Sequence, residues 1–211
     1  MTFIDFENYK NNRYDHQVKS EDFDNDHAID KMTAVSLRYE LEERTFDLLD
    51  QDYVCRWNGR HMIKSQNLAE HHAHTAQYLI ALFSIFKVPE DVQLEALKRA
   101  IVHDLPETEL CDIPYPVHVK YPEISEAYDK AERDVWHDKY PLYRSNVEKG
   151  STAWLLVKIA DRLDRINFLY DETQLGNDSD YVVQSLSDER EAVEDLIVEL
   201  GDRLETFLLI P

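Results

Sequence analysis

The chain of 211 residues contains little glycine, proline or cysteine: 4 Gly, 7 Pro and 2 Cys. So few turn-forming residues argue against a turn-rich all-β fold and favour long helices. Two thiols, Cys55 and Cys111, are too few for a disulfide scaffold. We expect both to be reduced, small apolar side chains in the interior.

Long apolar segments and the core of a signal peptide are also missing. The longest apolar run, Tyr78 to Phe86, is interrupted by Ser84. It falls well short of the roughly 18 residues that cross a bilayer. The N-terminus already carries the charged residues Asp5, Glu7 and Lys10, which a signal peptide would not place there. We therefore expect a cytoplasmic protein with no membrane partner.

Positive charge is scarce, because 23 Lys and Arg stand against 43 Asp and Glu, a formal net charge of −20 at pH 7. A surface this acidic repels phosphate backbones, so no nucleic-acid partner is expected. A small anionic substrate remains compatible with a locally basic pocket. Two basic clusters are candidates for such a pocket, with solvated helix faces as the alternative: Arg56, Arg60, His61 and Lys64, and then Lys158, Arg162 and Arg165.

Hydrophobic periodicity predicts helices at 33–50, 67–86, 89–104, 123–139, 151–172 and 187–208. Between them, residues 105–122 hold four of the seven prolines and are predicted to form a loop. Residues 1–30 are polar and acidic without a sustained period, which predicts a partly ordered N-terminal arm before a single domain at 31–211. No segment alternates for long at period two, so the predicted class is all-α.

The segment with the clearest chemical content is His103-Asp104, which closes an apolar helical run and precedes Glu107. An imidazole and an adjacent carboxylate can both bind a divalent cation, and a nearby Glu can transfer the protons of the attacking water. A second copy, His137-Asp138, ends a charged helix and has no Glu at the corresponding offset. We interpret that second pair as a helix terminus.

Histidines upstream and carboxylates downstream could complete a ligand set. On the 67–86 helix, His71 and His74 share a face while His72 points elsewhere. On the 151–172 helix, Asp161 ends an apolar stretch, and Asp164 faces a similar direction as a rival ligand. A buried carboxylate is costly without a cation or strong donors. The alternatives are ordinary buried or surface histidines, and for Asp161 a salt bridge with Arg162 or Arg165.

Together these motifs resemble those of the HD-domain phosphohydrolases, and more narrowly those of the YfbR-like 5′-deoxynucleotidases and their phage relatives, which include dATP triphosphohydrolases. The narrower resemblance rests on Arg56-Trp57 ahead of the first His, on Glu107 after His-Asp, and on the segment 112–117, which reads Asp-Ile-Pro-Tyr-Pro-Val. It covers roughly residues 33–200. His118-Val119 depart from the pattern, since family members run directly from Val to Lys at this point.

The resemblance implies an HD-domain helical bundle that binds a divalent cation, cobalt, manganese or zinc, through His71, His103, Asp104 and Asp161. It implies two catalytic residues: Glu107 as general acid or base, and Asp112 near the sugar. Implied substrate-binding residues are Arg56 on the phosphate, Trp57 on the sugar or base, and Lys120 and Lys158. For Trp57 a place in the core is the alternative, and for Glu107 a solvated loop residue.

The expected reaction is hydrolysis of a 5′-deoxynucleoside monophosphate to deoxynucleoside and phosphate, in a homo-oligomer that is a dimer or larger. A deoxynucleoside triphosphate (dATP-type) triphosphohydrolase is the alternative within the family. A non-catalytic nucleotide-binding protein is the alternative of another class, but a binding module has no need of Glu107. A cyclic-nucleotide phosphodiesterase is disfavoured because only His118 and His137 follow the His-Asp motif.

Overall fold

The computed structural model describes residues 34–36, 38–39, 41, 48–141, 143 and 147–208. The chain divides into two units, Met1–Asp47 and Leu48–Pro211. The predicted arm at 1–30 and its boundary with the domain lie outside the described residues. The described residues of the predicted 33–50 helix are helical up to Leu49 and are followed by the 3₁₀ helix η1, Asp50–Tyr53.

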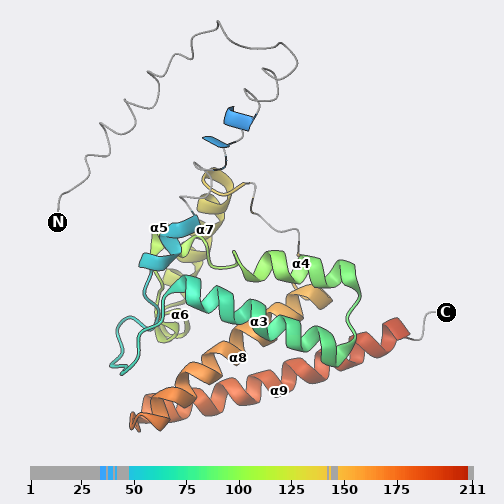
Figure 1. The fold of residues 1–211 in the computed structure, drawn as a ribbon. Helices are drawn as coiled ribbons and strands as arrows, with labels where there is room; N and C mark the ends of the chain where they lie inside the picture. Colours follow the sequence, from blue (N-terminus) through green and yellow to red (C-terminus); the bar gives the residue numbers. More distant parts are fainter. Residues whose placement is uncertain are drawn as a thin grey trace, which may run out of the picture. The chain divides into compact units, whose positions relative to one another are not determined.

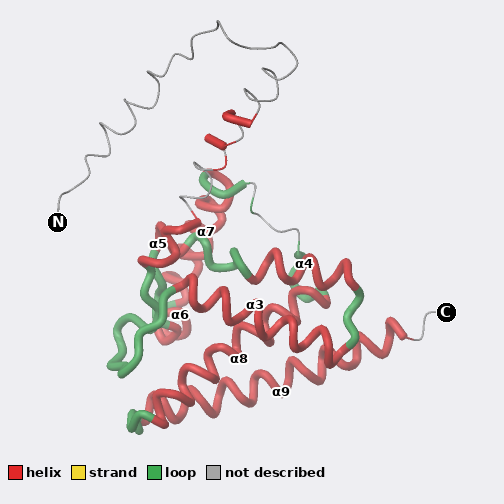
Figure 2. The backbone as a smooth tube through the Cα atoms, in the orientation of Figure 1, coloured by secondary structure: helices red, strands yellow, loops and turns green. Residues whose placement is uncertain are grey.

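Helices and loops make up the described part of the second unit, and Figure 2 shows no strand there. The helices that follow η1 are α3 Leu68–Phe86, α4 Glu90–Ala100, α5 Glu107–Leu110, α6 Tyr115–Lys120, α7 Pro122–Asp138, α8 Thr152–Gln174 and α9 Asp180–Leu208. The predicted all-α class is therefore confirmed. None of these helices combines the length and the hydropathy that crossing a membrane requires.

Two helical hairpins form the body of this unit. Helices α3 and α4 run antiparallel to each other, and so do α8 and α9 (Figure 1). Apolar side chains from all four helices meet between the hairpins, and those without solvent exposure include Leu79, Ala96, Leu155, Ile159 and Leu200. This core fixes α3, α4 and α8 relative to one another.

A capping box fixes the beginning of α3. The Asn67 side chain accepts a hydrogen bond from the Glu70 amide at 2.8 Å, and the Glu70 carboxylate accepts one from the Asn67 amide at 3.0 Å. Pro89 then precedes α4 and Ser151 caps α8 by accepting a hydrogen bond from the Trp154 amide. The first turn of α3, which contains His71, is thus held at a defined place.

The predicted helix at 89–104 ends early, at Ala100, and His103-Asp104 lie in turns. The Val102 and Leu105 amides bond to carbonyls three residues back rather than four. This change to tighter hydrogen bonding comes just before Pro106. Proline has no amide hydrogen and disfavours helical backbone at the residue before it. The prediction that the His-Asp pair ends a helix was therefore wrong by one turn.

The predicted loop at 105–122 was also partly wrong, because it contains α5 and α6, and α7 begins at Pro122. Proline is favoured in the first turn of a helix, where its missing amide has no partner to lose. Helix α9 begins at Asp180 rather than at residue 187, because Val182 and Leu186 pack with Leu169 of α8.

Two minor predictions had opposite outcomes. Cys55 and Cys111 are exposed, contrary to the expectation of buried thiols, because both lie in connections outside the helical core. His137 and Asp138 end α7 with side chains 81% and 78% exposed. The interpretation of this pair as a helix terminus is confirmed.

Candidate metal centre

Four predicted ligand side chains converge from three places in the fold. His71 lies in the first turn of α3, His103-Asp104 follow α4, and Asp161 lies near the middle of α8. Because α3 and α4 are antiparallel, the turns after α4 return to the beginning of α3. Helix α8 packs against both.

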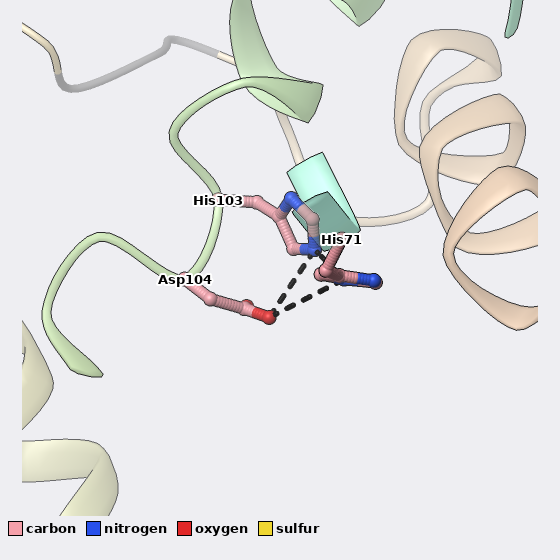
Figure 3. A group of neighbouring side chains, drawn as sticks. All are labelled: His71, His103 and Asp104. Atoms are coloured by element: carbon pink, nitrogen blue, oxygen red, sulfur yellow. Dashed lines mark hydrogen bonds and ion pairs between the residues drawn. The ribbon is translucent and has the colours of Figure 1, made fainter. Parts of the chain in front are cut away.

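The ligand atoms are close enough to share an ion. His71 Nε2 lies 3.2 Å from His103 Nε2 and 3.3 Å from Asp161 Oδ1. Asp104 Oδ2 lies 3.3 Å from His103 Nε2 and 3.8 Å from His71 Nε2 (Figure 3). Ligand atoms of His71, His103 and Asp104 all fall within 4.8 Å of one another, which is the arrangement of a metal site.

Both imidazoles direct a lone pair at this point. His103 Nδ1 lies 2.8 Å from the Ala100 carbonyl, which can only accept, so Nδ1 carries the hydrogen. Burial lowers the pKa of His103 to about 4, which keeps the ring neutral and leaves Nε2 without a hydrogen. His71 Nδ1 faces Asp164 Oδ2 at 2.6 Å, so its hydrogen also lies on Nδ1. Two acceptor nitrogens therefore face each other, an arrangement that a cation stabilises.

The carboxylates of the cluster are ionised. Burial alone raises the pKa of Asp104, but the neighbouring His103 and Arg56 bring it far below its usual value. The pKa of Asp161 is likewise low, because its burial is outweighed by the charge of the neighbouring Arg165 guanidinium. The Arg165 guanidinium donates to both Asp161 oxygens at 3.2 and 3.1 Å. The salt bridge considered as an alternative for Asp161 thus exists alongside its contact with His71.

Two neighbours of the ligands, Asp164 and His72, have roles that the sequence did not predict. Asp164, considered as a rival ligand, contacts the outer nitrogen of His71 and also His74 Nδ1, at 2.8 Å. Its own pKa is lowered, because the hydrogen bond from His71 outweighs burial. His72 is buried and bridges Gln51 and the backbone amide of Asp104. Sequence spacing could not reveal these roles, because each of these contacts joins two different elements: Asp164 lies on α8 and its histidine partners lie on α3, whereas His72 lies on α3 and its partners lie in η1 and after α4.

A cavity of about 250 Å³ adjoins the cluster. Its lining includes Asp104 together with the predicted substrate and catalytic residues Arg56, Trp57, Glu107 and Asp112. Lys120 and Lys158 are not among its described lining residues; their ammonium groups lie beside the rings of Tyr121 and Trp154. A larger open hollow of about 700 Å³, between α4, α8 and α9, contains none of the predicted site residues.

Arg56 and Glu107 each have buried side-chain atoms that lack a hydrogen-bond partner. The Arg56 side chain is 8% exposed, its Nη1 lies 3.6 Å from Asp104 Oδ2, and neither Nε nor Nη1 has a hydrogen-bond partner. Glu107 Oε2 also lacks a partner, and burial followed by repulsion from Asp104 raises the pKa of Glu107 to about 10. Because unpaired buried polar groups are costly, both residues are suited to contacting a ligand.

Asp112 and Trp57 are joined through the backbone. The Trp57 amide donates to Asp112 Oδ2 at 3.3 Å, and Trp57 has a φ of +64°, which L-residues rarely adopt. The indole stacks on Phe168 with ring centroids 4.9 Å apart. Asp112 thus holds the strained turn that carries Arg56 and Trp57, and Trp57 is at once a core residue and part of the cavity wall.

Comparison with known proteins agrees with this geometry. The model of the YfbR-like 5′-deoxynucleotidase family matches residues 46–208. The chain belongs to this family. No curated protein matches the chain. Solved structures do match, and they show that the YfbR-like chain has the HD-domain fold.

An HD-domain phosphohydrolase of Listeria innocua has a TM-score of 0.63 and 18% identity over 80% of this chain and 85% of its own. The PH0347 protein of Pyrococcus horikoshii OT3 has a TM-score of 0.60 and 28% identity over 78% and 96%. The HD phosphohydrolase DatZ of cyanophage S-2L, bound to dA and one catalytic Zn²⁺ ion, has a TM-score of 0.58 and 19% identity over 77% and 95%. Family and fold together identify the chain as a metal-dependent phosphohydrolase of nucleotides.

Proposed function

We propose that this YfbR-like protein hydrolyses 5′-deoxynucleoside monophosphates, using a divalent cation bound by His71, His103, Asp104 and Asp161. The supporting observation is the pair of imidazole lone pairs that face each other at 3.2 Å, with two ionised carboxylates beside them. This mixed nitrogen and oxygen donor set suits cobalt, manganese and zinc. When bound, the ion would polarise the phosphate and activate the attacking water.

Arg56 and Glu107 supply the remaining chemistry. The unpaired Nε and Nη1 of Arg56 are suited to donating to phosphate oxygens. Glu107 holds its proton at neutral pH and can donate it to the 5′ oxygen as the bond from phosphorus to that oxygen breaks. Its carboxylate then takes a proton from the water that has attacked phosphorus. The products are a deoxynucleoside and inorganic phosphate.

The charges around the cavity favour a single phosphate over three. Arg165 is engaged by Asp161 and Glu189, and Arg60 lies over the ring of Tyr181 with 4.2 Å between the guanidinium carbon and the ring centroid. Among the described lining residues, Arg56 is the one with buried guanidinium nitrogens, Nε and Nη1, that lack a hydrogen-bond partner. A triphosphate with about four negative charges would meet more carboxylates than free cations here.

Phosphate release from EDTA-treated protein tests this proposal, with dAMP, dGMP, dCMP, dTMP, AMP and dATP as substrates and Mn²⁺, Co²⁺ or Zn²⁺ added back. Cation-dependent phosphate from the deoxy monophosphates is the expected result. Tripolyphosphate released from dATP would instead support the triphosphohydrolase. No release from any substrate would contradict catalysis and favour a nucleotide-binding protein. The homo-oligomer and the cytoplasmic location stay predictions.

A further inference from the structure

Gln66 is a buried residue between the cavity and the metal centre, and no sequence motif drew attention to it. It lies just before α3, with 5% of its surface exposed. The Trp57 indole N–H donates to Gln66 Oε1 at 3.4 Å, and Gln66 Nε2 donates to Asp164 Oδ2 at 2.8 Å. The same Asp164 oxygen accepts the hydrogen of His71 Nδ1 at 2.6 Å. A continuous hydrogen-bonded relay therefore joins Trp57 to His71.

The direction of every bond in this relay is determined by chemistry. An indole nitrogen can only donate and an ionised carboxylate can only accept. The Gln66 amide must therefore direct its oxygen at Trp57 and its nitrogen at Asp164. Asp164 is 1% and Gln66 5% exposed, so the bond between them cannot be replaced by one to water without movement.

We propose that Gln66 and Asp164 are positioning residues that hold the metal-binding tautomer of His71 and the indole of Trp57 through one buried relay. The inference rests on the proposed function, since it takes His71 as a ligand and Trp57 as part of the nucleoside pocket. Metal affinity and nucleoside affinity then depend on the same two side chains. A residue that only supported the core would not link these two affinities.

His74 contacts Asp164 without belonging to the relay. Its Nδ1 faces Asp164 Oδ1, the oxygen that does not contact His71, and its side chain is 44% exposed. Solvent can replace this contact, so His74 is not needed to fix the tautomer of His71. The tautomer of His71 is held by the buried hydrogen bonds at Asp164 Oδ2.

The test compares Gln66→Met, Asp164→Ala and Asp164→Asn with the wild type. Methionine matches the length of glutamine but makes neither hydrogen bond, whereas asparagine keeps an oxygen that His71 and Gln66 can use. Gln93→Met is the control, because Gln93 is a partly buried glutamine that donates to the Val88 carbonyl, outside the site. Two dissociation constants are measured: that of Mn²⁺ for metal-free protein, and that of 2′-deoxyadenosine, which has no phosphate to contact an ion.

Asp164→Ala should weaken Mn²⁺ binding about 10- to 100-fold, the effect of losing a partner of a metal-binding histidine. Asp164→Asn should bind Mn²⁺ more tightly than Asp164→Ala but less tightly than the wild type. If the alanine variant does not fold, the Mn²⁺ affinity of Asp164→Asn is compared with that of the wild type. Gln66→Met should weaken both Mn²⁺ and deoxyadenosine binding by about 2- to 10-fold, as expected for one lost hydrogen bond on each side. Gln93→Met should change neither.

The relay would be refuted if Gln66→Met weakened the binding of only one of the two ligands, Mn²⁺ or deoxyadenosine, or of neither. Wild-type Mn²⁺ affinity in both Asp164 variants would also refute it. If the wild type binds Mn²⁺ and hydrolyses dAMP in these cases, the proposed function stands and only the relay fails. A wild type that binds no Mn²⁺ would instead contradict the proposed function, and the relay with it.

Discussion

Glu107→Gln separates proton transfer from metal binding. Glutamine keeps the size and polarity of the side chain but has no proton to donate to a leaving oxygen. The unpaired Glu107 Oε2 lies outside the group of His71, His103 and Asp104 ligand atoms, so metal affinity should be unchanged. We expect kcat to fall by about 10²- to 10⁴-fold, the usual effect of removing a general acid or base. This corresponds to about 2.7 to 5.4 kcal/mol of barrier.

The same variant tests the burial of Glu107 through the pH dependence of stability. The pKa of Glu107 is about 10 in the folded, metal-free protein, against an ordinary value of 4.5. Between these values the folded protein keeps a proton that the unfolded chain has lost, so raising the pH favours unfolding. The stabilisation present below pH 4.5 is therefore lost as the pH rises toward the folded pKa. The loss is at most about 1.4 kcal/mol per pH unit.

Urea unfolding of EDTA-treated wild type and Glu107→Gln at pH 5, 7 and 9 measures this effect. Wild-type stability should decline relative to the variant as the pH rises. Parallel curves would refute the account of a buried, protonated Glu107. Steady-state kinetics with saturating Mn²⁺ gives the rate. A variant with wild-type kcat, or one that no longer binds Mn²⁺, would refute the assigned role, and loss of the metal would make Glu107 a ligand.

Three further substitutions have expected outcomes. Trp57→Ala should bring the turnover of dAMP and AMP closer together, because the indole lines the cavity; a ratio unchanged on the same protein sample would leave Trp57 a core residue only. Ile159→Ala should lower the free energy of unfolding by about 2 to 5 kcal/mol in urea denaturation, because Ile159 has no solvent exposure. Glu172→Ala should cost about 1 to 3 kcal/mol in the same assay, since it leaves the amides of Ile63 and Lys64 without their acceptor.

Local signals in the sequence were enough to predict most of the fold. Asn67 and Glu70 form a capping box, so the beginning of α3 was correct to one residue. The 151–172 helix was predicted because its apolar residues repeat at helical spacing, and α8 indeed spans Thr152–Gln174. Errors arose where one residue type is common in two kinds of structure. Proline occurs both in loops and in the first turn of helices, and Pro122, interpreted as a loop residue, begins α7.

The candidate site was predictable only in part. The motif residues could be found because the resemblance to the family fixed their order and spacing, and the fold brings His71, His103 and Asp104 together. The partners of those residues could not be found in this way. Asp164 and Gln66 act through contacts across 93 and 98 residues of sequence, and such contacts exist only after α3 and α8 have packed.

Metal content measured on matched variants tests the central claim most directly. Purified wild type and Asp104→Ala are loaded with Mn²⁺, dialysed and analysed for bound metal, with Asp138→Ala as the control because Asp138 is exposed at the end of α7. The account predicts stoichiometric Mn²⁺ in the wild type and in the control, and its loss, together with phosphate release from dAMP, in Asp104→Ala. Full metal occupancy with normal turnover in Asp104→Ala would contradict it.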